Sequence, residues 1–351
     1  MKILITGIAG FVGCNMAKYF KQHYANYTIL GIDNLSRRGS EHNLKLLQNL
    51  NCQFIYGDIR AKEDVDSLPA CDWIIDCAAI PTVTAGISDS SLALINNNLS
   101  GTIFILEKCK RDGCGFILLS TSRVYSIPAL NAIPITNAHT RFELPQITNV
   151  QGLSANGIAE NFSTTAPISL YGAGKLASEL LALEYSYLFN FPVWINRCGV
   201  IAGPGQFGKI DQGIFSYWIY KYALHQPLSY MGFQGSGKQV RDMLHPYDLF
   251  TIINAQLHMQ QNNSTKLYNI GGGLQNALSL FELNEICKEL FFENKIIGSI
   301  PENRPYDIPV YISNADLAKQ HFNWSCSFDT IQILKEIASY AKNNKHLIAN
   351  F

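Results

Sequence analysis

The sequence has little charge of either sign and no long apolar run. Only 15% of its 351 residues are charged, and 27 basic residues balance 27 acidic ones. Without an excess of charge, nothing indicates a nucleic-acid or membrane-surface partner. A membrane-spanning helix needs about 20 apolar residues in succession, and three glycines interrupt the opening MKILITGIAGFVGCNM. We therefore expect neither a membrane anchor nor export.

The cysteines lack the spacings of disulfide frameworks and metal centres. There are nine, an odd number, and no two form a C-x-x-C pair. They lie in apolar segments, which is typical of buried free thiols in a reducing compartment. We therefore predict a cytoplasmic protein without a metal site.

Short β-rich apolar segments alternate with helical patterns through the first half of the chain. Strands are predicted at residues 2–7, 27–33, 52–59, 73–79, 115–122 and 192–198. Helices are predicted from about Gly13, from about Glu41, over 97–111 and around Tyr171. Such alternation predicts βαβ units in an α/β fold with a Rossmann-type doubly wound parallel sheet.

After about Cys198, Gly- and Pro-rich loops separate shorter elements, so we expect a second, smaller mixed α/β domain. The segment 126–169 is long for a connection within a compact domain. It is therefore either a functional loop or partly structured.

A glycine-rich turn follows the first predicted strand and opens the first helix. In ILITGIAGFVG the glycines are Gly7, Gly10 and Gly13. They let the backbone approach a pyrophosphate, whose charge is favoured by free amides at the helix N-terminus. Asp33 follows about 20 residues later at the end of the second strand, where a carboxylate can bind both hydroxyls of an adenosine ribose.

The carboxylate of Asp33 would repel a 2′-phosphate, so NAD is predicted rather than NADP. Arg37 and Arg38 lie just downstream and leave NADP open, although an exposed basic turn also explains them. Asp58, after the third strand, fits an adenine contact or a cap of the following turn.

Tyr171 and Lys175 stand four residues apart on a predicted helix and therefore share one face. A free phenol has a pKa near 10 and is a poor base at neutral pH, but a nearby cation favours the phenolate. The pair could instead be a partly buried tyrosine beside a snorkelling lysine. Thr121, at the C-terminal end of the preceding strand, favours the general base, since ligands bind at such strand ends.

These motifs, in this order, resemble the extended short-chain dehydrogenase/reductase family of nucleotide-sugar epimerases and dehydratases. The resemblance covers essentially the whole chain and implies NAD as the cofactor. It implies that Thr121 hydrogen-bonds the reacting oxygen, that Tyr171 is the acid/base and that Lys175 holds the nicotinamide ribose. Further cofactor-binding positions that it implies are Phe11, Val12, Asn34, Asp58, Ile59, Ala78, Ala79 and Asn98.

The segments DNLSRRGSEHNL, GQFGKIDQG and GSGKQVRDMLHPYD look like those of CDP-paratose (CDP-tyvelose) 2-epimerases. This resemblance implies epimerisation at carbon 2 of a nucleotide-diphosphate sugar through a transient ketone, and a place in carbohydrate (lipopolysaccharide) biosynthesis. A nucleotide-sugar 4-epimerase, a reductase and a non-catalytic NAD-binding sensor remain alternatives.

The nucleotide-sugar substrate needs a pyrophosphate anchor, because the sugar must turn during the reaction. Arg241 and Arg304 are the predicted anchors, since guanidinium forks match phosphate oxygens. Each could instead form an ion pair with a neighbour, such as Asp242 or Asp307. Other predicted substrate-binding residues are Gln206, Lys209 and Asp211.

The resemblance also implies domain boundaries and assembly. It places residues 1–197 with 237–268 in an NAD-binding domain and residues 198–236 with 269–351 in a nucleotide-sugar-binding domain. A homodimer or homotetramer through a helix bundle that includes the Tyr171 helix is expected.

Three positions depart from the patterns of relatives. Asp76 stands where many relatives carry a histidine, and Val200 stands where 4-epimerases carry a substrate asparagine. Ser122 and Arg123 stand where 4,6-dehydratases place Asp-Glu after the threonine. These departures disfavour the substrate pose of a 4-epimerase and the elimination of water.

Overall fold

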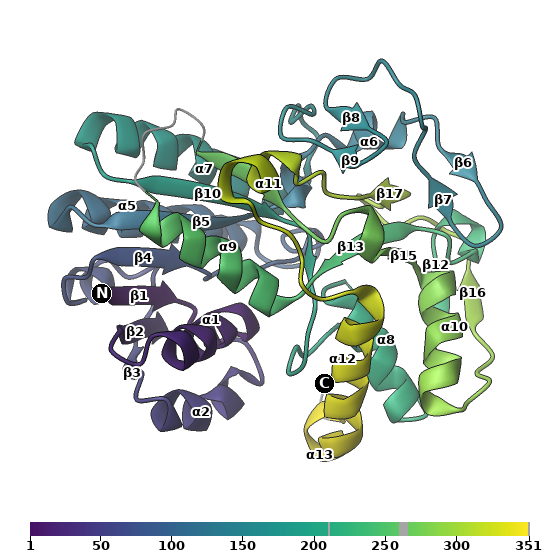
Figure 1. Cartoon of the computed structure of the whole chain (residues 1–351), viewed down its shortest axis with the longest axis horizontal. Coiled ribbons are helices and arrows are strands. Elements are labelled where there is room, and N and C mark those ends of the chain that lie inside the picture. The colour runs from purple at the N-terminus through teal and green to yellow at the C-terminus, as the bar shows by residue number, and fades with distance from the viewer. Residues whose placement is uncertain (210, 260–265, 350–351) are drawn as a thin grey trace. The chain divides into compact units, whose positions relative to one another are not determined.

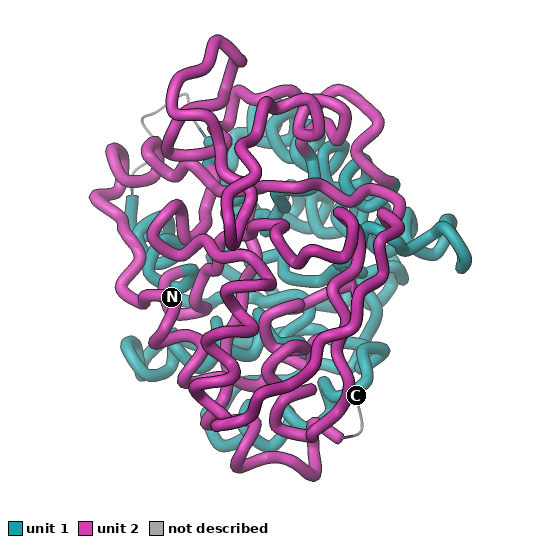
Figure 2. Tube along the Cα trace, turned by 90° about the vertical axis from the view of Figure 1, so that its right-hand side faces the viewer, with its two compact units in different colours: residues 1–124, 170–197, 249–268 teal, residues 125–169, 198–248, 269–351 magenta. Residues whose placement is uncertain are grey.

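The structure is a computed structural model that describes residues 1–209, 211–259 and 266–349. The chain divides into two compact units, which Figure 2 colours separately. Unit 1 comprises residues 1–124, 170–197 and 249–268, and unit 2 comprises 125–169, 198–248 and 269–351. Residues 125–169 and 237–248, which the sequence analysis assigned to the NAD-binding domain, thus belong to unit 2.

Unit 1 is built around a seven-stranded sheet (Figure 1). Its strands are β1 (Lys2–Thr6), β2 (Thr28–Asp33), β3 (Gln53–Tyr56), β4 (Trp73–Asp76), β5 (Gly115–Thr121), β10 (Val193–Cys198) and β14 (Leu267–Ile270). They lie in the order β14-β10-β5-β4-β1-β2-β3. Strand β1 pairs in parallel with β2 and β4, and β4 with β5. The predicted Rossmann-type doubly wound sheet is confirmed, with its strand order reversing between β1 and β4.

Helices cover both faces of this sheet. They include α1 (Phe11–His23), α2 (Leu44–Asn49), α3 (Lys62–Asp66), α4 (Ser91–Ile95), α5 (Gly101–Asp112), α7 (Ser169–Phe189) and α9 (Pro246–His258). On one face, α5 and α7 bury Ile105 and Ala182 in the same core as Ile195 of β10. Elsewhere in unit 1, α1 and α9 pack through Phe20 and Phe250, whose ring centroids lie 5.0 Å apart. Burial of each large apolar side chain contributes about 1.5–3 kcal/mol.

Unit 2 has a smaller sheet and its own helical core. The sheet contains β11 (Val200–Ile201), β13 (Val240–Leu244), β15 (Ala277–Ser279) and β17 (Val310–Tyr311), and a separate pair is formed by β12 (Ser229–Met231) and β16 (Gly298–Ile300). The helices include α8 (Ile214–Ala223), α10 (Leu280–Phe291), α11 (Asp316–Phe322), α12 (Thr330–Asn343) and α13 (Lys345–Ile348). Trp218, Leu283 and Ile337 are buried together between α8, α10 and α12.

The segment 126–169 is partly structured, which resolves the alternative left open by the sequence. It contains α6 (Ile127–Asn131) and two short hairpins, β6 (Thr136–Asn137) with β7 (Phe142–Glu143), and β8 (Leu153–Ser154) with β9 (Gly157–Ile158). The Arg141 guanidinium and the Thr140 hydroxyl both donate to Oε1 of Glu282 on α10, each at 2.7 Å. These bonds fasten the segment to the rest of unit 2.

Two further sequence predictions can be compared with the fold. All nine cysteines are free, and five of them are buried. Helix α1 begins at Phe11, earlier than the predicted Gly13, because Gly10 already has the extended conformation of an N-cap.

Among the described residues, no helix combines the length and the apolar character that crossing a membrane requires.

Candidate active site

The glycine turn after β1 is closely packed against the residues that follow β4. Gly7 has a positive φ of +63°, and a Cβ added there would lie 3.1 Å from the Cα of Ala78. A Cβ on Gly13 would lie 2.3 Å from the carbonyl oxygen of Gly7, so no side chain fits at that position. The turn lies at the carboxyl ends of β1 and β4, where the strand order reverses and where open α/β sheets bind ligands.

Helix α1 begins at this turn without a capping side chain. Its N-cap is Gly10, whose own amide donates to the carbonyl oxygen of Gly7 at 3.0 Å. Phe11 and Val12 form the first helical positions. The first amides of a helix lack intrahelical partners and carry a partial positive charge. The turn and helix end therefore fit the diphosphate of a dinucleotide.

Asp33 lies beside the glycine turn, at the end of β2. Its Oδ2 accepts from the Ala9 amide at 3.0 Å, and its Oδ1 accepts from the Leu35 amide at 2.8 Å. Burial raises the pKa of this carboxyl, and the backbone amides partly oppose that effect. These bonds hold the Asp33 carboxylate beside the glycine turn, which is where its spacing from the three glycines predicts it.

The contacts of Asp58 match the turn-capping interpretation. Its Oδ1 accepts from the amide and from the Nε of Arg60, each at 2.9 Å. The Arg60 guanidinium is the main cause that lowers the pKa of Asp58 to about 2. Asn34 donates to Asp58 Oδ2 at 2.9 Å, and the neighbouring Ile59 is buried. An adenine contact by Asp58 stays a prediction.

Asp76 is the centre of a buried polar network below the turn. Its carboxylate is fully buried and accepts from the hydroxyls of Thr6 at 2.6 Å and Thr102 at 3.0 Å. The Ala78 amide donates to the same Thr6 hydroxyl at 3.0 Å. Asp76 thus ties β4 to β1 and α5.

Asn98 fixes the segment after Ala78 and Ala79. Its Oδ1 accepts from the Ile80 amide at 2.8 Å, and its Nδ2 donates to the Ile80 carbonyl at 3.0 Å. It lies in a π-helical turn, Asn96–Ser100, a feature that is frequent at functional sites. Helix α7 contacts this turn, because the Ser178 hydroxyl donates to the Asn98 carbonyl at 3.1 Å.

Tyr171 and Lys175 are both buried on α7, with 7% and 1% of their surface exposed. Tyr171 packs with Ala85 and Leu94. Burying the charge of a lysine this deeply is costly unless other groups compensate it. Thr121, the last residue of β5, is also buried, and its hydroxyl accepts from the Arg123 amide at 3.1 Å.

A buried ion pair next to these residues was missed by the sequence analysis. Arg197 of β10 and Glu179 of α7 pair at 2.7 Å, and Ser120, next to Thr121, donates to the same carboxylate. One signal was available, because Glu179 continues the spacing of Tyr171 and Lys175 along one helix face. Its partners are distant in sequence, so their identity was not predictable.

The predicted substrate-binding arginines of unit 2 bind groups within their own unit. Arg241 donates to the carbonyl oxygens of Val240 at 2.6 Å and Ile308 at 2.8 Å. Arg304 pairs with Asp307 at 3.1 Å, which is the ion pair that its alternative interpretation expected. A role of either guanidinium in binding phosphate stays a prediction.

The other predicted substrate residues lie in the loop before α8. Gln206 donates to the Ile201 carbonyl and accepts from the Ser216 hydroxyl, both at 2.9 Å. Lys209 is exposed and its backbone pairs with that of Gln212, and Asp211 is half-buried. Among residues 1–209, 211–259 and 266–349, no group of three or more His, Cys, Asp or Glu side chains is arranged to hold a metal ion.

Comparison with known proteins gives both a family and individual relatives. The model of the NAD dependent epimerase/dehydratase family matches residues 3–271. A CDP-paratose 2-epimerase of Salmonella typhi is 29% identical over 336 residues, which cover 93% of this chain and 94% of that protein. A UDP-glucuronate 4-epimerase of Thermodesulfobacterium geofontis is 26% identical over 357 residues, covering 98% of this chain and 97% of that protein.

Solved structures with the same fold include two that span the whole chain. The dTDP-glucose 4,6-dehydratase of Bacillus anthracis, determined with NAD, has a TM-score of 0.76 at 25% identity and covers 100% of this chain and 99% of its own. The UDP-glucose 4-epimerase of Thermotoga maritima, determined with UDP-glucose, has a TM-score of 0.78 at 22% identity, with coverages of 98% and 100%.

Proposed function

The chain belongs to the NAD dependent epimerase/dehydratase family, and from that premise we propose that it inverts carbon 2 of a nucleotide-diphosphate sugar, interconverting CDP-paratose and CDP-tyvelose. It is an enzyme, and its cofactor is NAD. The observation that carries the proposal is that Tyr171 and Lys175 are buried together on one face of α7, in the unit that also holds Thr121 and the glycine turn. The likeness to a CDP-paratose 2-epimerase supports the choice of carbon 2.

The proposed NAD site uses residues of unit 1. The turn of Gly7, Gly10 and Gly13 holds the diphosphate, and Asp33 holds the adenosine ribose. Lys175 holds the nicotinamide ribose. The adenine side is formed by Asn34, Asp58 and Ile59, and the nicotinamide side by Ala78, Ala79 and Asn98. Bound NAD supplies the group that takes a hydride from the sugar carbon and later returns it.

Tyr171 moves the proton in the proposed mechanism. As phenolate it accepts the proton of the substrate hydroxyl, while the Thr121 hydroxyl hydrogen-bonds the same oxygen. The buried Lys175 ammonium stabilises the phenolate. Once the ketone has formed and the sugar has turned its other face, Tyr171 returns the proton. The reaction therefore ends without net oxidation or reduction.

The proposed substrate site uses residues of unit 2. Arg241 and Arg304 bind the pyrophosphate, since bidentate guanidinium bonds to phosphate are strong. Gln206, Lys209 and Asp211 lie near the sugar. In this proposal residues 198–236 with 269–351, together with Arg241, bind the nucleotide sugar, and the remainder of 1–197 with 237–268 binds NAD. Val200, Ser122 and Arg123 support inversion at carbon 2 over 4-epimerisation or dehydration.

The direct test is incubation of the purified protein with CDP-paratose, followed by NMR. CDP-tyvelose should form without added NAD, since the cofactor stays bound. The matched control is Tyr171→Phe, which removes only the acid/base oxygen and should form product at least about 100-fold more slowly. Stoichiometric consumption of added NADH would identify a reductase instead, and inversion of carbon 4 would identify a 4-epimerase. Either result would refute the proposal.

We also propose a homodimer or homotetramer through α7. Leu180, Tyr187 and Leu188 form an exposed apolar stripe along this helix, with exposed fractions of 60%, 84% and 64%. Replacing Leu180 by Glu should convert the assembly to monomers in size-exclusion chromatography with light scattering. A wild-type protein that is already monomeric would refute this assembly.

The nine free thiols support a cytoplasmic location, because such thiols persist in reducing compartments. There the proposed activity would serve carbohydrate biosynthesis, as in lipopolysaccharide assembly. Fractionation of the source cells tests the location. Recovery of the protein from the secreted fraction would contradict it.

A further inference from the structure

The geometry points to Glu179 as a positioning residue for the reaction, an inference that rests on the proposed function. We infer that the Glu179 carboxylate holds Ser120 and Arg197 in place. This keeps the Thr121 and Tyr171 side chains at a fixed distance and orientation relative to each other, so that both reach the same substrate oxygen.

The carboxylate of Glu179 is buried, and both of its oxygens accept hydrogen bonds. The Ser120 hydroxyl donates to its Oε1 at 2.5 Å. Nε of Arg197 lies 3.0 Å from Oε1 and 3.1 Å from Oε2, and a terminal guanidinium nitrogen donates to Oε2 at 2.7 Å. The two side chains are only 2% and 6% exposed. A guanidinium and a carboxylate paired in this forked way hold each other in one plane.

Three elements meet at this carboxylate. Glu179 belongs to α7, Ser120 to β5 and Arg197 to β10, and β5 and β10 are neighbours in the sheet. Ser120 directly precedes Thr121 in the chain. Tyr171, Lys175 and Glu179 follow one another at intervals of four residues, so they lie along one face of α7. A shift of α7 against β5 would therefore move the phenol relative to the threonine hydroxyl.

Stability alone does not account for the ion pair. Replacing a buried ion pair with apolar residues of similar volume is often neutral or stabilising. Its forked geometry instead specifies how α7 lies on the sheet. Reactions of this kind are sensitive to such placement, since a misplacement of about 1 Å can lower the rate about 100-fold.

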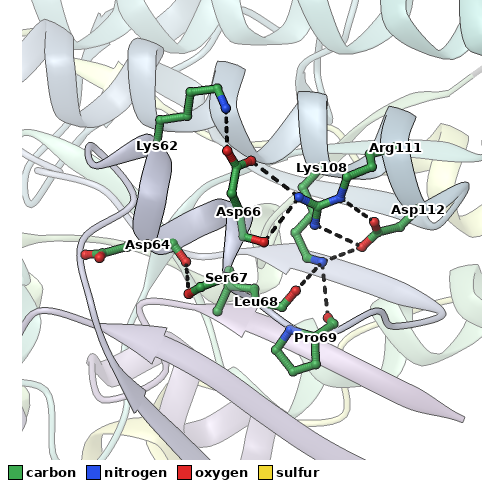
Figure 3. Close-up of polar contacts among 9 residues, drawn as sticks. All are labelled: Lys62, Asp64, Asp66, Ser67, Leu68, Pro69, Lys108, Arg111 and Asp112. Atoms are coloured by element: carbon green, nitrogen blue, oxygen red, sulfur yellow. Dashed lines mark hydrogen bonds and ion pairs between the residues drawn. The ribbon is translucent and has the colours of Figure 1, made fainter.

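A second buried ion pair in unit 1 provides a matched control (Figure 3). Lys108 is buried, pairs with Asp112, and donates to the carbonyl oxygens of Leu68 and Pro69 at 3.1 Å each. It joins α5 to the segment that precedes β4, at the amino end of the strand. Thr121 lies at the carboxyl end of β5. Breaking the Lys108 pair should disturb the fold as much as breaking the Glu179 pair, without moving the reacting groups.

The test compares steady-state kinetics with CDP-paratose for the wild type, Ser120→Ala, Ser120→Thr, Glu179→Gln and Asp112→Asn. Ser120→Ala removes a single donor and should lower kcat about 10-fold with KM and bound NAD nearly unchanged. Ser120→Thr keeps the hydroxyl and should restore kcat. Glu179→Gln should lower kcat about 100-fold. Asp112→Asn should lower Tm with kcat within about twofold of the wild type.

Equal kcat values for the wild type, Ser120→Ala and Ser120→Thr would overturn the inference. So would a loss of activity in Glu179→Gln that only matches its unfolded fraction. If Glu179→Gln does not fold, the two Ser120 variants decide. If the wild type does not convert CDP-paratose, the proposed substrate fails. The positioning role is then read from crystal structures of the NAD complexes, in which Ser120→Ala should change the Thr121 Oγ1 to Tyr171 Oη distance by at least about 0.5 Å. An unchanged distance would refute it.

Discussion

The two units hold their predicted site residues in different ways. In unit 1, Asp33 lies at a strand end and Asn98 in a π-helical turn, and both are fixed by bonds to backbone amides. In unit 2, Arg241 binds backbone carbonyls and Arg304 binds Asp307. We therefore propose that the cofactor and acid/base half is preformed, whereas Arg241 and Arg304 exchange their present partners for those of a ligand.

Three arginines illustrate the difference. Arg197 is buried in a forked bond to Glu179, and removing that carboxylate would leave an uncompensated charge. Arg241 donates to two carbonyl oxygens, which carry no net charge. Phosphate oxygens offer a guanidinium stronger, charge-assisted bonds. We therefore propose that Arg197 maintains the site and that Arg241 binds the ligand.

The largest effect is expected in the preformed half, from Tyr171→Phe. The variant keeps the ring that packs with Ala85 and Leu94 but has no oxygen to accept the proton. General acid–base catalysis contributes about 10²–10⁴-fold, so kcat should fall by that factor. Bound NAD and Tm should not change. Full turnover would show that another group moves the proton.

In the substrate half, Arg241→Met should act mainly on KM. A hydrogen bond to a charged group contributes about 1.5–3 kcal/mol, and each 1.4 kcal/mol is tenfold in affinity. We expect KM to rise about 10–100-fold with kcat less affected. The same change at Arg304 should act less, because Asp307 already competes for that guanidinium. A larger loss in kcat than in KM would remove the distinction between the two units.

A third variant, Asp33→Asn, tests how the preformed half selects its cofactor. Loss of the charge should weaken NAD binding about 10-fold, since a charge-assisted bond contributes about 1.5 kcal/mol or more, and should improve NADP binding. Titration calorimetry on protein stripped of cofactor measures both affinities. Unchanged affinities would place the adenosine ribose elsewhere.

The smallest effect is expected from Asp58→Asn. Arg60 lowers the pKa of Asp58 from 3.8 to about 2, so the contribution of this carboxylate to stability is complete above about pH 4 and is lost as the pH falls through 2. Because Arg60 is 42% exposed, the contribution should be below about 1 kcal/mol. Acid unfolding curves of the variant should be slightly flatter in this range. An identical curve would assign no stability to the pair.

The sequence predicted the preformed half well because its signals are local. Strand and helix patterns, the glycine turn and Asp33 each lie within one βαβ unit. It did not predict α3, a helix of only five residues, or the short hairpins of 126–169, whose two-residue strands are too short for a periodic pattern.

Contacts between distant residues account for the rest of what was missed. Glu179 is 59 positions from Ser120 and 18 from Arg197, so spacing alone could not pair them. The partners of Arg241 likewise include Ile308, 67 positions away. The Arg304–Asp307 ion pair and the turn cap by Asp58 both involve neighbours in sequence. For that reason the sequence alone suggested them as alternatives.

In the proposed reaction Tyr171 moves a proton while the hydrogen on carbon 2 is carried to bound NAD and back. Conversion of CDP-paratose in ²H₂O, with the product analysed by NMR and mass spectrometry, follows that hydrogen directly. CDP-tyvelose should form without deuterium at carbon 2, because the hydrogen never exchanges with water. Deuterium at carbon 2 would show removal of a proton from carbon and would contradict the account.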